Sequence, residues 1–207
     1  MPQFAFCRAH VILGDGDTVV YLPMDPQRAA ELQRLLPAPR PTLVALYDLD
    51  WNAALSPWPA PRAFRGGADF AGRADDFLQE LTGRIIPAVE TVPAGRRILA
   101  GYSLGGLFAV YAALNTDMFH RVASVSGSMW YDGFCDYALV RPCLAEKVCM
   151  SLGDREKNTR NQRMAAVESC SLRIARHLGC ALEMNPGGHF QDELPRMAKA
   201  VAALMDK

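Results

Sequence analysis

Ser103 stands in the segment Gly101-Tyr102-Ser103-Leu104-Gly105, a G-x-S-x-G pattern. Residues 97–100 before it are mostly apolar, and apolar residues at helical spacing follow it. This order of strand, tight turn and helix is typical of a nucleophile elbow, whose strained turn projects a serine hydroxyl above the edge of a sheet. Glycines are needed in such a turn where a Cβ would clash. The pattern therefore predicts that Ser103 is a nucleophile.

A serine hydroxyl needs a neighbouring base to take its proton, and a histidine is the usual choice. The chain has four histidines. His10 lies beside an apolar run, His120 precedes another, and His177 falls in the last turn of a predicted helix, where the helix dipole favours it. His189 differs, because it lies on the Gly-rich loop 185–190 directly after a predicted strand. We expect His189 to be the base.

The acid that orients such a histidine has two candidates. Asp154 and Glu156 follow Gly153 at the end of an apolar run, so the chain order is nucleophile, acid, histidine, as in enzymes with this elbow. Either carboxylate could instead be an exposed charge at the start of the next helix. The residues alone leave open whether Asp154, Glu156 or neither plays this part.

Two backbone N–H groups must also stabilise the negative oxygen that develops during attack. One donor should be the N–H of Leu104, the residue after the nucleophile. We expect the other in the loop after the predicted strand at residues 43–47, at Asp48 or Leu49.

The elements that position these groups alternate between strands and helices. Apolar runs predict strands at residues 43–47, 97–100, 122–126, 147–152 and 180–184. Because the runs are apolar throughout and helical patterns separate them, both faces of the sheet should be covered. We expect an α/β fold with one domain over residues 1–207, in which a mostly parallel sheet is flanked by helices.

The remaining segments have less regular signals. Residues 11–13 and 18–22 flank a Gly/Asp turn and predict a hairpin, or a strand entered from a turn. Helices are expected at 25–36, 158–178 and 191–205, and at 68–90 with an interruption near Gly83 or Pro87. Residues 53–67 form a long Pro- and Gly-containing loop, and loops of this length are usually functional or disordered.

Composition narrows the classes of function. Lys plus Arg and Asp plus Glu number 22 each, which argues against a nucleic-acid partner. No apolar run reaches the ~18 residues of a membrane helix, and no signal peptide is recognisable. The six cysteines show no zinc-like spacing, so we expect no metal, and no cofactor is expected either. Without an export signal, we expect the cysteines to be buried thiols and the protein to be cytoplasmic.

From about Thr42 onward the chain resembles the esterase branch of the α/β-hydrolase family. That branch includes esterase D-type enzymes and the trilactone esterases that open enterobactin-like siderophores. The resemblance rests on the elbow segment 101–109, on Ser126-Gly127-Ser128-Met129-Trp130, on residues 153–156 and on Gly187-Gly188-His189. The second of these is similar to the family's S-P-S-x-W segment, with Gly127 in place of proline.

The resemblance implies several features of the site. The family's acid commonly stands three residues after the strand-end glycine, which corresponds to Glu156, although some siderophore esterases use a Ser–His dyad. Trp130 should lie beside the nucleophile, and Tyr131 and Trp51 could also line the cleft. Only about 16 residues, 131–146, separate two strands where relatives often insert a lid. A small enzyme without a large lid is implied.

We therefore expect a serine esterase that acts on a small-molecule ester through an acyl-enzyme. Ser103 would attack, His189 would transfer the proton and Glu156 would orient His189. There are two alternatives. One is an acyltransferase or thioesterase with the same intermediate, and the other is a catalytically inactive hydrolase fold used for binding. The substrate and the oligomeric state are not predicted.

Overall fold

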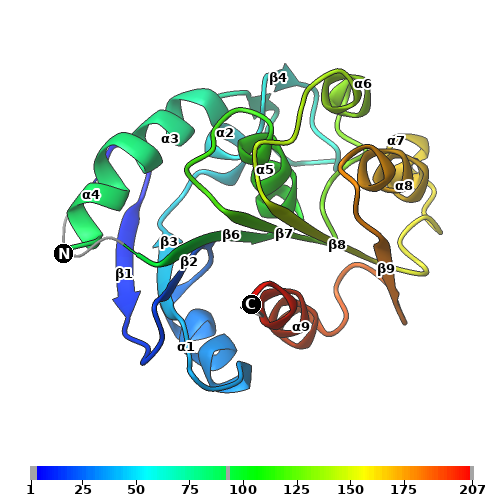
Figure 1. Ribbon diagram of the computed structural model, residues 1–207. Helices are drawn as coiled ribbons and strands as arrows, with labels where there is room; N and C mark the ends of the chain where they lie inside the picture. Colours follow the sequence, from blue (N-terminus) through cyan, green and yellow to red (C-terminus); the bar gives the residue numbers. More distant parts are fainter. Residues whose placement is uncertain (1–3, 92–93, 206–207) are drawn as a thin grey trace.

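Seven strands form one twisted sheet in the computed structural model, which describes residues 4–91 and 94–205 (Figure 1). Their order across the sheet is β1-β3-β2-β6-β7-β8-β9. β1 pairs antiparallel with β3, and the other neighbouring pairs are parallel. The strands are β1 (Arg8–Ile12), β2 (Thr18–Pro23), β3 (Thr42–Tyr47), β6 (Arg96–Tyr102), β7 (Arg121–Val125), β8 (Lys147–Gly153) and β9 (Leu182–Asn185). The predicted mostly parallel α/β sheet is confirmed.

Helices cover both faces of this sheet, as the apolar strands require (Figure 1). α1 (Pro26–Leu35) and α9 (Glu193–Met205) pack on one face with their own apolar cluster. The second and larger cluster lies under the helices of the other face. Those helices are α3 (Ala74–Glu80), α4 (Ile86–Val89), α5 (Leu104–Ala113), α6 (Phe134–Leu139) and α8 (Val167–His177).

The first two strands do not form the hairpin that the Gly/Asp turn suggested. β3 lies between β1 and β2 and pairs with both. The turn instead packs on the segment before β3, where the N–H groups of Asp15 and Gly16 donate to the carbonyl of Arg40. A Cβ at Gly14 would lie 2.2 Å from that same carbonyl oxygen. The chain therefore enters β2 from a turn, which was the second interpretation.

Two predicted helices are divided. The helical pattern at 68–90 begins only at Ala74, because Phe70–Ala71 form β5, which pairs with β4 (Pro59–Ala60). The expected interruption near Gly83 is a π-helical turn, η1 (Leu81–Ile85). The pattern at 158–178 consists of α7 (Gln162–Ala165), capped by the side chain of Asn161, and α8.

The segments around the predicted site are short. The long loop begins with α2 (Trp51–Ala54) and includes β4. Residues 131–146 hold only α6, so the structure has no large lid in the place where relatives often carry one. Among the described residues, no helix combines the length and the apolar composition that a membrane span requires.

Candidate active site

Ser103 occupies the sharp turn between β6 and α5. Its backbone has φ 56° and ψ −121°, a conformation that non-glycine residues rarely adopt. The turn is tight because a Cβ at Gly101 would lie 2.2 Å from the backbone of Gly105, and one at Gly106 would lie 2.9 Å from Gly127 Cα. Strain of this kind is tolerated where the surrounding structure fixes the backbone. The turn has the shape that the G-x-S-x-G pattern predicted.

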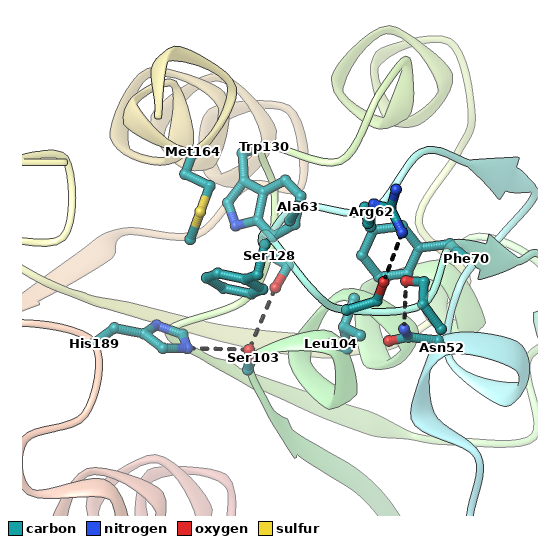
Figure 2. A pocket seen from close by; sticks show the side chains of 13 residues that line it. Asn52, Arg62, Ala63, Phe70, Ser103, Leu104, Ser128, Trp130, Met164 and His189 are labelled. Carbon is teal, nitrogen blue, oxygen red and sulfur yellow. Dashed lines mark hydrogen bonds between the residues drawn. The ribbon is translucent and has the colours of Figure 1, made fainter. Parts of the chain in front are cut away.

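His189 lies next to the serine. Its Nε2 is 3.0 Å from Ser103 Oγ (Figure 2), and its Nδ1 is 2.7 Å from Glu156 Oε2. The hydroxyl of Tyr102 donates to the carbonyl of His189, which ties the histidine loop to the elbow strand. The structure thus brings a hydroxyl, an imidazole and a carboxylate into one hydrogen-bonded line.

Glu156 is the carboxylate in this line, and its side chain is only 3% exposed. Its other oxygen, Oε1, accepts hydrogen bonds from the Gly153 N–H and the Ser126 hydroxyl, both at 2.7 Å. Burial by itself would raise the pKa of Glu156. The hydrogen bonds from His189, Ser126 and Gly153 and the charge of His189 outweigh it, so the pKa lies below its ordinary value. Glu156 is therefore held as an anion facing the imidazole.

Asp154 has a different environment. Its side chain is 55% exposed, and its Oδ1 accepts a hydrogen bond from the Gly187 N–H at 2.8 Å. Gly187 belongs to the histidine loop and has a φ of 106°. Asp154 therefore braces the loop that carries His189 and makes no hydrogen bond with the imidazole.

Arg196 also contacts the candidate site, and its place there was not predicted from the sequence. It projects from α9 with a side chain 3% exposed, and its Nη1 lies 3.5 Å from Glu156 Oε1 and 3.4 Å from Ser126 Oγ. Its Nη2 donates to the carbonyl of Pro186 in the histidine loop at 2.8 Å. A signal was present, because Arg196 is four residues before Ala200 on the otherwise apolar face of α9. A charge at a core position indicates a buried partner.

The other histidines serve elsewhere. His120 Nδ1 accepts from the N–H of Arg97 at 3.0 Å, and His177 Nε2 lies 2.7 Å from the carbonyl of Arg141. His10 is on β1, at the far edge of the sheet from His189.

The expected oxyanion donors require a correction. Leu104 begins α5, so its N–H is among the first helical N–H groups, which lack an intrahelical acceptor. Ser103 lines two hollows on the surface of the protein, and Asp48 and Leu49 line neither of them. These two residues line a separate, third hollow. The strand beside β6 is β2 and not β3, so the loop after β2 is the one that reaches the serine.

Among the aromatic candidates, Trp130 and Ser103 line the same cavity. Trp51 is 37% exposed and lines a second hollow on the other side of Ser103. Tyr131 does not line the cleft, and that expectation is wrong. It is 2% exposed, its hydroxyl donates to the carbonyl of Trp58, and its ring packs on Phe70.

Ser103 and His189 lie between these two hollows. The first has a volume of about 110 Å³ and is the more enclosed (Figure 2). Its lining residues are Asn52, Arg62, Ala63, Phe64, Gly67, Ala68, Phe70, Ser103, Leu104, Ser128, Trp130, Met164 and His189. The second measures about 370 Å³, is open to solvent and is bordered by Pro23, Met24, Asp25, Arg28, Trp51, Tyr102, Phe190 and Glu193. The long loop at 53–67 thus forms one wall of the site.

The cysteines are unpaired, and Cys7 and Cys135 are buried. Burial, with the charge of Glu80, raises the pKa of the Cys7 thiol to about 12. Within residues 4–91 and 94–205, no three His, Cys, Asp or Glu side chains are grouped in a way that could hold a metal ion.

Comparison with known families gives one match over most of the chain. The family model Esterase, described as "Putative esterase", matches residues 27–178. The uncharacterized protein YbbA of Bacillus subtilis (strain 168) is 31% identical over 139 residues, which are 63% of this chain and 54% of that protein. The match therefore spans about half the length of that curated relative.

Solved structures share the fold at low sequence identity. An IroE-like serine hydrolase from Shewanella oneidensis has a TM-score of 0.76 at 18% identity, over 95% of this chain and 74% of that chain. The siderophore hydrolase EstA from Aspergillus nidulans has a TM-score of 0.69 at 19% identity, over 92% and 83%. Both likenesses concern the fold.

Proposed function

Because the chain belongs to the esterase family, we propose that it hydrolyses carboxylic esters through an acyl-enzyme on Ser103. The observation that carries the proposal is the line of contacts from Ser103 Oγ through His189 to Glu156, at 3.0 Å and 2.7 Å. These are hydrogen-bond distances for a nucleophile, its base and the group that orients the base.

The reaction runs in two halves. His189 Nε2 takes the hydroxyl proton of Ser103 while Oγ bonds to the acyl carbon, and then gives the proton to the departing alcohol as the C–O bond breaks. Water attacks the acyl-enzyme by the same route and releases the acid. Glu156 holds Nδ1–H in place, so that Nε2 faces the serine without a proton.

Backbone N–H groups stabilise the oxyanion in this proposal. Leu104 supplies the first. Pro23, the last residue of β2, has no N–H, and in the loop that follows the N–H of Met24 donates to the carbonyl of Leu46 at 3.1 Å. The N–H of Asp25 is therefore the second donor that we propose, in place of Asp48 or Leu49.

The substrate is a small-molecule ester. Two of the similar structures are siderophore hydrolases from Aspergillus nidulans, which supports including siderophore lactones among the candidates. We further propose one domain over residues 1–207, supported by a single sheet from Arg8 to Asn185. The six unpaired cysteines support a reducing, cytoplasmic location.

A fluorophosphonate probe tests the mechanism, because only an activated serine reacts with it. The wild-type chain should be labelled and should hydrolyse p-nitrophenyl butyrate. Ser103→Ala should lose both properties, with a rate loss on the order of 10⁴-fold or more and little change in melting temperature. Labelling without turnover of any ester, thioester or lactone would instead favour a transferase, and a wild type that is not labelled would indicate a binding protein.

A further inference from the structure

The enclosed cavity beside Ser103 has a mostly apolar lining. Side chains of Phe64, Phe70, Leu104, Trp130 and Met164 form its walls. In Figure 2, Trp130 and Met164 stand on the far side of the cavity from Ser103. Two polar side chains at its margin are engaged elsewhere: Asn52 Nδ2 donates to the carbonyl of Ala68 at 2.9 Å, and Arg62 Nη1 to that of Gly67 at 3.2 Å. A third, Ser128, has its Oγ 3.4 Å from Ser103 Oγ.

Hydrogen bonds hold these walls together across distant parts of the sequence. Asn161 Nδ2 donates to the carbonyl of Ala63 at 2.9 Å, and Arg163 Nη1 donates to that of Pro61 at 2.6 Å. The guanidinium of Arg163 also lies 5.3 Å from the ring centroid of Trp130. α7 is thereby tied to the long loop and to the tryptophan, so the cavity has a defined size before a ligand binds.

The hollow on the other side of Ser103 has the opposite character. It is about 370 Å³ and open, with an ion pair between Arg28 and Glu193 at 3.0 Å on its border. Phe190, which is 88% exposed, lies at its rim. The acyl group and the alcohol group of an ester behave differently during the reaction of a serine esterase. The acyl group becomes bonded to Ser103 in the first step and is released only when water cleaves that bond in the second, whereas the alcohol must leave between the two steps and water must enter.

We propose that the enclosed cavity is the acyl pocket and selects short, apolar acyl groups, while the open hollow receives alcohols of varied size. This inference rests on the proposed esterase function and adds its substrate class. The volume of this cavity, about 110 Å³, is smaller than that of an apolar cavity of about 150 Å³ that binds benzene. We therefore expect the cavity to accept a butyryl group and to exclude a phenyl ring.

Rates on a series of p-nitrophenyl esters, from acetate to octanoate, test the size limit. Each methylene buried in the pocket should raise kcat/KM by about fourfold, from ~0.8 kcal/mol of transfer free energy. The gain should end near butyrate, and octanoate should be cleaved at least about tenfold more slowly than butyrate. Rates that keep rising to octanoate would overturn the proposal while leaving the esterase function intact.

Met164→Ala should enlarge the pocket and move the optimum toward hexanoate. Met164 is half-buried on a short helix, so the variant should fold. Met184→Ala is the matched control, because Met184 is 42% exposed on β9 and lines neither hollow. Its optimum should stay at butyrate. An unchanged optimum in Met164→Ala would contradict the assignment of the cavity.

Two isomeric esters test which half enters which hollow. Benzyl butyrate has a short acyl group and a bulky alcohol, whereas propyl phenylacetate has a bulky acyl group and a short alcohol. Both esters release a primary alcohol. We expect benzyl butyrate to be cleaved at least about tenfold faster, since a pocket of fixed size discriminates by this amount or more. Equal rates, or a preference for the phenylacetate, would refute the proposal. Failure of every ester together with no labelling of Ser103 would refute the esterase function itself, and this inference with it.

Discussion

Replacing Glu156 with glutamine tests the candidate site most directly, because the geometry determines how the amide must lie. Glu156 Oε1 faces three donors. The Gly153 N–H and the Arg196 guanidinium can only donate, and the Ser126 hydroxyl donates to Oε1 in this structure. The amide oxygen of Glu156→Gln must therefore take this place. Its NH₂ group then faces His189 Nδ1 where a carboxylate oxygen accepted before.

The consequence is the wrong tautomer of the imidazole. Nδ1 must accept from the amide, so Nε2 carries the proton and cannot take one from Ser103. A change of this kind lowers kcat by a factor on the order of 10⁴. The neutral amide also leaves Arg196 buried without an anion, and breaking a buried pair costs about 3 kcal/mol. At roughly 2–4 °C per kcal/mol for a chain of this size, the melting temperature should fall by about 6–12 °C.

The assay is the initial rate of p-nitrophenyl butyrate hydrolysis at 25 °C, with the melting temperature measured on the same samples. Asp154→Asn is the matched control, because the Asp154 carboxylate contacts the loop N–H of Gly187 and the guanidinium of Arg155 but not the imidazole. This substitution should change the rate by less than about threefold. If Glu156→Gln retained more than a tenth of the wild-type rate, a Ser–His dyad would replace the three-residue site. A large loss in Asp154→Asn alone would transfer the orienting role to Asp154.

Three further outcomes are expected. Arg196→Met should lower kcat by at least about tenfold with little change in KM, because Arg196 positions Glu156 and the carbonyl of Pro186. Steady-state kinetics measures both constants, and a tenfold change in KM with kcat unchanged would indicate a merely structural role. The folded-state pKa of Glu156 lies below its ordinary value of 4.5, so its contribution to stability is present above that pH and is lost as pH falls through the folded pKa. Urea unfolding should therefore show a steeper loss of stability below about pH 4.5 in the wild type than in Glu156→Gln, and parallel curves would contradict this. Cys7, with a pKa of about 12, should react with iodoacetamide at pH 8 at least about a hundredfold more slowly in the native than in the urea-unfolded chain, as followed by peptide mass spectrometry.

The sequence predicted those features that local physics determines. The elbow at Ser103 follows from glycines where backbones approach closely, and the apolar runs identify the strands because both faces of each are buried. His189 was predictable because it follows a strand that ends at the same edge of a parallel sheet as the elbow, whereas that edge suited Asp154 and Glu156 equally and the choice of Glu156 came from the family resemblance. The structure brings Glu156 and His189 together, and the roles assigned to them stay predictions until the variants are measured.

The order of the strands was not predictable in the same way. Nothing in the periodicity of residues 18–22 and 43–47 states which of the two pairs with β6. The second oxyanion donor was accordingly expected at Asp48 or Leu49, after β3, whereas the strand beside β6 is β2 and the donor that we propose follows it. Tyr131 was misassigned for a related reason, since an aromatic side chain beside Trp130 has the same composition whether it faces a cleft or the core. Which strand pairs with β6, and whether Tyr131 faces the cleft or the core, depend on contacts between distant segments of the folded chain.

The position of Arg196 on α9 links the site to the order of synthesis. A ribosome makes the chain from its N-terminus, so the elbow, the carboxylate and the histidine loop all emerge before α9 does. Until α9 docks, Glu156 lacks its buried cation and the loop lacks the bond to Pro186. A nascent chain that has emerged as far as the histidine loop should therefore hydrolyse esters poorly, and a rise in ester hydrolysis would mark the docking of α9.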